Sequence, residues 1–180
     1  MIHLATGIAV RQEHLLMVAS RYPNQPQPLW NLPGGRQQPG ELLAETVVRE
    51  FLEETSLHVT VRELAYISES YDGDRHFVNA AFLVDVVDGL AFDNPSTKPV
   101  LSAVEGLRVT QDGPSTPLRV TTGGDHIVAV EWVALDQVRE RIAVAVVREP
   151  LVAFLEGTLE RRYAGYHEAG ITIEWPDDSA

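Results

Sequence analysis

Apolar and polar residues alternate in two stretches near the start of the chain, at residues 5–12 (ATGIAVRQ) and 14–20 (HLLMVAS). A period of two is typical of β-strands that turn one face to a core. The short connection Gln12-Glu13-His14 joins them, so the pattern predicts an opening β-hairpin. Alternation also predicts strands at residues 57–70 (LHVTVRELAYISES) and 75–87 (RHFVNAAFLVDVV), joined by the turn YDGD, and at residues 126–135 (HIVAVEWVAL).

A proline-rich stretch and a helical pattern follow the first hairpin. Residues 20–41 (SRYPNQPQPLWNLPGGRQQPGE) contain five prolines and three glycines, so we expect a loop without regular structure. From Glu41 to about Thr55, apolar residues recur every three or four positions, which predicts a helix with one face packed on a sheet. That face consists of Ala44, Val47, Val48, Phe51 and Leu52.

The second half of the chain has a weaker pattern. Residues 89–124 mix turn residues with short apolar runs, which is compatible with an extra hairpin, a lid or a partly mobile insertion. A helix is expected over about 136–159, broken or kinked at Pro150, and ITIEW near the end predicts a short strand. No repeat or linker separates these parts, so we expect one α/β (α+β) domain over residues 1–180, with an insertion or lid at about 89–124.

The formal charge of −12 and the pI near 4.8 restrict the partners of the chain. A surface for long nucleic acid or an anionic membrane needs clustered lysine and arginine, so we expect neither. The chain has no cysteine, which excludes disulfides, zinc-thiolate sites and thiol nucleophiles. No basic segment opens the chain and no window approaches the ~18 apolar residues of a membrane span, so we expect a cytoplasmic protein. Assembly as a homodimer is left open.

Three glutamates crowd one helix face within REFLEET at residues 49–55. At about 100° per residue, Glu50, Glu53 and Glu54 fall within an arc of about 100°, away from the apolar face. Like charges repel, so this arrangement is favourable where a cation neutralises them, and hard oxygen ligands select Mg²⁺, Mn²⁺ or Ca²⁺. Taken alone, the same pattern is also typical of a solvated acidic face.

The residues around the helix decide between these two interpretations. Gly34 and Gly35 precede it, and paired glycines let the backbone bring its amide and carbonyl groups close to a ligand or metal. Five residues separate Gly35 from Glu41, and seven more lead to Arg49-Glu50-Phe51-Leu52-Glu53-Glu54-Thr55-Ser56-Leu57. This spacing resembles the Nudix box, Gly-x5-Glu-x7-Arg-Glu-(apolar)-x-Glu-Glu-x-Gly-(apolar), at every defined position but Ser56. Serine there replaces a glycine that follows the helix end, where a positive φ is often required.

The resemblance implies the Nudix fold, a mixed β-sheet between α-helices, and hydrolysis of a nucleoside diphosphate linked to another moiety X. It further implies that Glu50, Glu53, Glu54 and the Gly35 carbonyl hold Mg²⁺, with Mn²⁺ as a substitute. Such an ion neutralises the pyrophosphate and lowers the pKa of a bound water. Either Glu53 or Glu54 is the general base in this interpretation.

Two further residues of the box have supporting roles in the same resemblance. Arg49 lies between the carboxylates along the helix, where it either orients one of them through a charged hydrogen bond or forms a simple ion pair. Glu41, in the first turn, faces the positive end of the helix dipole, which indicates a structural role.

Candidates for substrate binding lie outside the acidic helix and include Gly34 in the turn before it. Arg21 is similar in place to an arginine that meets substrate phosphate in Nudix enzymes, although a surface arginine at a strand end explains it equally well. Trp30 and Tyr71 are able to stack on a base, yet Trp30 is also typical of a core residue and Tyr71 of a turn. Asp125 is a candidate remote carboxylate for metal or base chemistry, against the simpler role of a turn aspartate after two glycines.

The resemblance leaves the substrate open. A nucleoside di- or triphosphate, standard or oxidised, is the leading expectation, followed by a dinucleoside polyphosphate, a nucleotide sugar or ADP-ribose. After Leu57 the next proline is Pro95, which disfavours subfamilies marked by prolines shortly after the box. A non-catalytic, nucleotide-sensing Nudix module is the alternative from a different class, and the complete set of box glutamates favours the enzyme.

Overall fold

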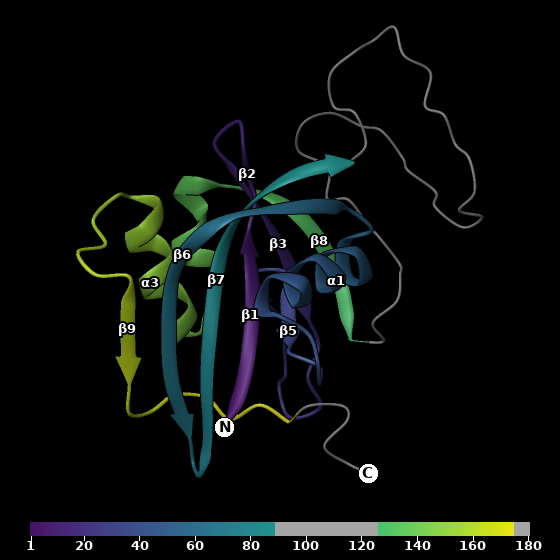
Figure 1. Ribbon diagram of the computed structural model, residues 1–180. Coiled ribbons are helices and arrows are strands. Elements are labelled where there is room, and N and C mark those ends of the chain that lie inside the picture. The colour runs from purple at the N-terminus through teal and green to yellow at the C-terminus, as the bar shows by residue number, and fades with distance from the viewer. Residues whose placement is uncertain (89–125, 175–180) are drawn as a thin grey trace, which may run out of the picture.

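Figure 1 shows the protein as a computed structural model, which describes residues 1–88 and 126–174. The predicted insertion at 89–124 lies outside the described residues. No helix of the described part is both long and apolar enough to cross a membrane.

The strands are β1 (Ile2–Ile8), β2 (Val10–Arg11), β3 (His14–Ser20), β4 (Leu29–Asn31), β5 (Gly34–Arg36), β6 (His58–Asp72), β7 (Arg75–Asp88), β8 (Ile127–Ala134) and β9 (Tyr163–Tyr166). The helices are α1 (Leu43–Thr55), α2 (Val138–Arg141) and α3 (Ala145–Leu155), and a short 3₁₀ turn, η1 (Leu135–Gln137), precedes α2.

The strands form two sheets. The five-stranded sheet has the order β5-β1-β7-β6-β9, in which β1 and β7 are parallel, β6 and β9 are parallel, and the other pairs are antiparallel. In the second sheet, β3 pairs antiparallel with β2, β4 and β8. Helix α1 covers one side of the strands and α3 covers the other (Figure 1). The predicted mixed α+β fold, with strands between helices, is confirmed.

The opening hairpin is shorter than predicted because the first stretch divides between the two sheets. Residues 2–8 pair with β7 and partly with β5, and only Val10–Arg11 pair with β3. Gln12 and Glu13 have φ values of 46° and 62°, as a two-residue type I′ turn requires. Alternation predicted the strand correctly, but a period of two does not say which partner a strand takes.

The expectation of a loop without regular structure over residues 20–41 was wrong in two places. Leu29–Asn31 forms β4 beside β3, and Gly34–Arg36 forms β5 beside β1. A Cβ atom at Gly34 would lie 2.2 Å from the Ala5 carbonyl oxygen, so glycine is what lets the two backbones approach this closely. A residue that signals a turn in the sequence thus permits a strand here.

Strand β3 is buried on both faces and separates two hydrophobic clusters. Its Leu15 belongs to the cluster beneath α2 and α3, which contains Leu151. The next residue, Leu16, belongs to the cluster beneath α1, which contains Phe51. The residues alternate because successive side chains of a strand point to opposite faces of the sheet. Each helical layer therefore has a core of its own.

Helix α1 packs with a narrower apolar face than the sequence predicted. Val47 and Phe51 are fully buried, whereas Val48 and Leu52 are 37% and 43% exposed. A Cβ atom at Gly7 of β1 would lie 2.3 Å from the Phe51 ring, so the helix lies close against this strand. The prediction that all five apolar residues pack on the sheet was therefore wrong for Val48 and Leu52.

The predicted break at Pro150 was also wrong. Pro150 is buried inside α3, and the chain turns instead at residues 142–144, where Ile142 and Val144 have extended backbones. Arg148 stabilises this turn by donating from Nη1 to the carbonyls of Ile142 and Ala143 at 3.0 and 3.2 Å. Proline removes its own N–H from the helical ladder and crowds the carbonyl four residues earlier, yet α3 continues through Pro150 to Leu155.

A strand lies near the C-terminus, but not at the predicted place. The described part of ITIEW, residues 171–174, has no strand. Residues 163–166 form β9 instead, parallel to Ile67–Ser70 of β6. The sequence YAGY contains alanine and glycine, which are poor strand formers, so it gave no strand signal.

Candidate active site

Helix α1 begins two residues later than predicted, and this changes the position of Glu41. The helix starts at Leu43, with Leu42 at its N-cap, so Glu41 precedes the first turn. The Glu45 carboxylate accepts the Leu42 N–H at 2.8 Å and supplies the cap. Glu41 instead accepts from the Gln38 N–H and the Thr46 hydroxyl, both at 3.0 Å. Glu41 is thus structural, as predicted, but through these bonds and its pairing with Arg49.

Arg49 links the acidic residues of the site. Its Nε and Nη2 donate to the two carboxylate oxygens of Glu41 at 2.6 and 3.1 Å. Its Nη1 donates to Glu50 Oε1 at 2.8 Å and to Glu53 Oε2 at 3.1 Å. Nη2 also donates to the Arg36 carbonyl at 3.1 Å, so every N–H of the guanidinium has an acceptor. These contacts include ion pairs and are compatible with both predicted roles, orientation of a carboxylate and simple ion pairing.

The contacts and burial around Arg49 change the pKa values of its partners Glu41 and Glu50. The hydrogen bonds from Arg49 and from the Gln38 N–H hold the pKa of Glu41 at about 2. Burial raises the pKa of Glu50, and the neighbouring Arg49 partly opposes that effect. Glu41 therefore stays ionised at neutral pH and pairs there with the Arg49 guanidinium.

Glu54 differs from the other glutamates because it is buried. Its side chain is only 6% exposed, whereas that of Glu53 is 50% exposed. Glu54 Oε2 accepts the Gly34 N–H at 2.8 Å, and Oε1 lies 3.9 Å from His126 Nε2. Burial raises its pKa to about 8, against the opposing effect of the Gly34 hydrogen bond.

The sequence placed Glu54 with Glu50 and Glu53 on one helix face, and the structure separates their contacts. Glu50 and Glu53 share Arg49, whereas Glu54 is turned toward Gly34. Among the His, Asp and Glu side chains of residues 1–88 and 126–174, no three gather as a formed metal site would require.

The donors still have the chemistry that a hard divalent ion needs. A Cβ atom at Gly35 would lie 2.4 Å from Glu50 Oε1, so the bare backbone at Gly35 lies directly beside this carboxylate. Glu54 is a buried carboxylate with a raised pKa, a group whose charged form a bound cation would favour. Oxygen donors of this kind fit Mg²⁺ or Mn²⁺. The groups that would hold such an ion are the predicted ones, Glu50, Glu53, Glu54 and the Gly35 carbonyl.

The residues predicted to bind substrate lie in different places. Arg21 is exposed at the end of β3, and its backbone N–H donates to the His126 carbonyl at 2.7 Å. Trp30 packs against the cluster beneath α2 and α3, with the Arg141 guanidinium 4.7 Å from its ring. Tyr71 lies at the tip of the β6–β7 hairpin.

The structure thus places Gly34 and Arg21 on the side of Glu54. Trp30 is partly buried against the core, and Tyr71 stacks on His76 with ring centroids 4.4 Å apart. Asp125 lies outside the described residues.

Sequence reasoning missed the side chains that surround Glu54. Tyr22 is 6% exposed, and its ring centroid lies 6.4 Å from that of His126. Burial raises the pKa of the Tyr22 hydroxyl, and the nearby Glu54 carboxylate raises it further. The signal lay in strand pairing, because Ser20 pairs with Ile127 and so brings Tyr22 beside His126. Alternation alone did not reveal that pairing.

A glycine turn leading into an acidic helix, on a mixed sheet between helices, defines the class of the protein as a Nudix-type hydrolase. The family model described as the NUDIX domain matches residues 1–154. The chain belongs to the Nudix family. The fold implied by the resemblance is thereby confirmed.

Two curated relatives and one solved structure extend the comparison. The chain is 33% identical over 92 residues to an ADP-ribose pyrophosphatase from Methanocaldococcus jannaschii, a match covering 49% of this chain and 54% of that protein. It is 56% identical over 34 residues to a Bacillus subtilis protein provisionally named an 8-oxo-dGTP diphosphatase, covering 19% and 23% of the two chains. A Nudix hydrolase structure from Nitrosomonas europaea matches with a TM-score of 0.62 at 17% identity and covers 99% of each chain. The curated matches span about half or less of those relatives, and the solved structure shares the fold.

Proposed function

We propose that the protein is a Mg²⁺-dependent pyrophosphohydrolase that cleaves a nucleoside diphosphate linked to another moiety X. The observation that carries the proposal is the arrangement of Glu50, Glu53 and Glu54 around Arg49 and the Gly34-Gly35 turn. Bound Mg²⁺ would neutralise the diphosphate and lower the pKa of a bound water. Mn²⁺ as a substitute, a cytoplasmic location and a homodimer remain predictions.

The carboxylates of α1 supply the remaining chemistry. Water adds to a phosphorus of the diphosphate, the bond from that phosphorus to the bridging oxygen breaks, and the water proton passes to a carboxylate. Burial raises the pKa of Glu54 to about 8 and also raises the pKa of Glu50, which makes each ionised carboxylate a stronger proton acceptor. Glu50 therefore joins Glu53 and Glu54 as a candidate for the general base.

The leading substrate is a nucleoside di- or triphosphate, standard or oxidised. The relative provisionally named for 8-oxo-dGTP supports it through a short match of 56% identity. ADP-ribose is the second candidate, because the longer match, over 92 residues, is to a protein named an ADP-ribose pyrophosphatase. Dinucleoside polyphosphates and nucleotide sugars follow.

The test is a phosphate-release and product-mass screen with Mg²⁺, with and without excess chelator. The panel contains dGTP, 8-oxo-dGTP, nucleoside diphosphates, ADP-ribose, nucleotide sugars and dinucleoside polyphosphates. We expect cleavage within one diphosphate linkage. Excess chelator and the substitution Glu54→Gln should each abolish that cleavage. Silence across the panel, with nucleotides still raising the melting temperature, would identify a non-catalytic sensing module instead. Undiminished turnover in chelator would contradict the role of the metal.

A further inference from the structure

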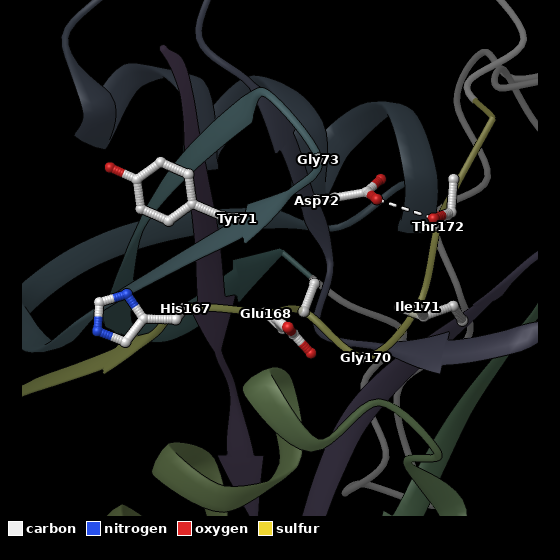
Figure 2. Close-up of a pocket in the computed structure, with 9 residues that line it drawn as sticks. Tyr71, Asp72, Gly73, His167, Glu168, Gly170, Ile171 and Thr172 are labelled. Atoms are coloured by element: carbon white, nitrogen blue, oxygen red, sulfur yellow. Dashed lines mark hydrogen bonds between the residues drawn. The ribbon is translucent and has the colours of Figure 1, made fainter.

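The chain continues past the part that matches the family model, which ends at residue 154. After β9, residues 167–174 pass from the tip of the β6–β7 hairpin to the loop over residues 21–28. We call residues 167–174 the C-terminal strap. Figure 2 shows the strap running beside Tyr71 and Asp72, with Thr172 directed at the Asp72 carboxylate.

One end of the strap is attached to the hairpin. The Ala169 N–H donates to the Tyr71 carbonyl at 2.7 Å. The Thr172 hydroxyl donates to Asp72 Oδ1 at 2.8 Å. Arg75 Nη2 donates to the Ile173 carbonyl at 2.8 Å. These bonds fix the path of the strap over the turn between β6 and β7.

The other end is attached to the loop over residues 21–28. The Thr172 carbonyl accepts from Asn24 Nδ2 at 2.8 Å and from Gln25 Nε2 at 2.9 Å. The Glu174 N–H donates back to Asn24 Oδ1 at 3.1 Å. Thr172 therefore contacts the hairpin through its hydroxyl and the loop through its carbonyl.

Hydrogen bonds, rather than apolar packing, hold the strap in place. A pocket of about 560 Å³ lies between the strap and the hairpin tip, so the two do not pack tightly there. Glu168 and Asp72 line this pocket, and their carboxylates repel a nucleotide phosphate. The strap is therefore not closely packed on the hairpin tip around this pocket. We assign the pocket no ligand.

The loop held by the strap carries residues of the candidate active site. Arg21 and Tyr22 open this loop, and Tyr22 lies beside His126, whose Nε2 is 3.9 Å from Glu54 Oε1. Prolines at 23, 26 and 28 have no N–H to donate. The Asn24 and Gln25 side chains therefore supply contacts that the loop backbone cannot supply for itself.

We propose that the C-terminal strap is a positioning element that holds the 21–28 loop against the substrate side of the site. Contacts at the hairpin tip then determine how well Arg21 and Tyr22 are placed for a nucleotide. The structural part of this proposal is independent of catalysis, and its kinetic part rests on the proposed function.

The structural part is tested by backbone hydrogen exchange in the full chain. Thr172→Val removes the hydroxyl that contacts Asp72 and leaves intact the carbonyl that contacts the loop. Loss of one such bond changes an opening equilibrium by roughly two- to tenfold. Exchange of the Gln25 amide, which donates to the Tyr22 carbonyl at 3.1 Å, should accelerate by about that factor in Thr172→Val and also in Asn24→Ala. Thr158→Val, which removes a hydroxyl bonded to Ala153 at the end of α3, is the matched control and should not change it.

The kinetic part uses each of dGTP, 8-oxo-dGTP and ADP-ribose that the unaltered protein hydrolyses. Thr172→Val and Asn24→Ala should each raise KM about two- to tenfold and leave kcat within about twofold, since α1 is untouched. Unchanged loop exchange in Thr172→Val would overturn the proposal, whatever the activity. Faster loop exchange with unchanged KM would overturn the positioning role. Absence of hydrolysis by the unaltered protein would defeat the proposed function alone, because the exchange result stands without a substrate.

Discussion

The two helical layers of the protein differ in what they hold together. Beneath α2 and α3 the contacts are apolar, and Leu151 is fully buried among other aliphatic side chains. Beneath α1, Phe51 packs in the same way, but the adjoining faces of the helix carry Arg49 and the glutamates. Burial of Glu54 disfavours its ionised form, since a carboxylate loses its hydration there.

This difference supports the proposal that the α1 layer serves the chemistry and the opposite layer serves stability. A carboxylate with a pKa near 8 is unfavourable for the fold and useful for proton transfer or cation binding. The opposite layer carries no comparable group in its buried cluster of described residues. Substitutions in the two layers should therefore separate activity from stability.

The largest expected effect is on the α1 side. Glu54→Gln should lower kcat by about 10²- to 10⁴-fold, because the neutral amide cannot accept a proton or pair with a cation. Its oxygen can still accept the Gly34 N–H, so the melting temperature should change little. Steady-state kinetics on the best substrate of the panel measures the effect, with the exposed helix residue Glu45→Gln as the control. Near-normal turnover by Glu54→Gln would remove this glutamate from the mechanism.

Leu151→Ala tests the opposite layer. It should lower the free energy of unfolding by about 2–5 kcal/mol, because a fully buried leucine leaves a cavity. Activity per folded molecule should stay the same. Urea unfolding and kinetics at a temperature well below the transition measure the two quantities. A fall in kcat as large as that of Glu54→Gln would show that the two layers do not act separately.

Arg49→Lys should have an intermediate effect on both quantities. An ammonium group cannot contact Glu41 in a bidentate manner while also reaching Glu50 and Glu53. We therefore expect a loss of about 1–3 kcal/mol in the free energy of unfolding and a clear fall in kcat. Arg139→Lys is the matched control, because Arg139 is 53% exposed and pairs with surface glutamates. Equal effects of the two substitutions would contradict the linking role of Arg49.

The pH dependence of stability should reveal Glu54 in metal-free protein. Its pKa is raised from 4.5 to about 8, so the folded chain keeps a proton that the unfolded chain releases. The resulting stability is present in full below about pH 4.5 and is lost as the pH rises through about 8. The slope cannot exceed about 1.4 kcal/mol per pH unit. Urea unfolding in chelator should show this slope, and Glu54→Gln should remove it; an unchanged slope would assign it to another group.

The smallest effect is expected at the end of α1. Ser56 has a φ of 57°, in the left-handed region, where the family has glycine. Ser56→Gly should stabilise the protein by at most about 1 kcal/mol, or roughly 2–4 °C in Tm, without changing kcat. Calorimetry measures the gain. A loss of stability would mean that contacts of the serine side chain outweigh the backbone strain.

The sequence predicted the parts of the structure that depend on local pattern. The long strands β6 and β7, the extent of α1 and the positive φ at Ser56 all follow from spacing within a single stretch. The Nudix box identified the acidic helix and its Arg49 for the same reason.

The remaining features depend on contacts between distant stretches. The surroundings of Glu54 include Gly34, which lies twenty residues earlier in the chain, and Tyr22. The strap depends on Thr172 meeting Asp72 and Asn24. No period within one stretch encodes such pairings, and the sequence pattern did not reveal that Glu54 is buried.

The division of the first strand between two sheets has a consequence for the order of folding. Residues 2–8 complete their pairing with β7, and β3 completes its pairing with β8. On a ribosome, the apolar segments β1 and β3 must therefore wait until β8 has been synthesised before both sheets can close. Such distant pairings slow folding and leave apolar strands exposed in the meantime. The N-terminal segment is accordingly where nascent chains would depend most on chaperones.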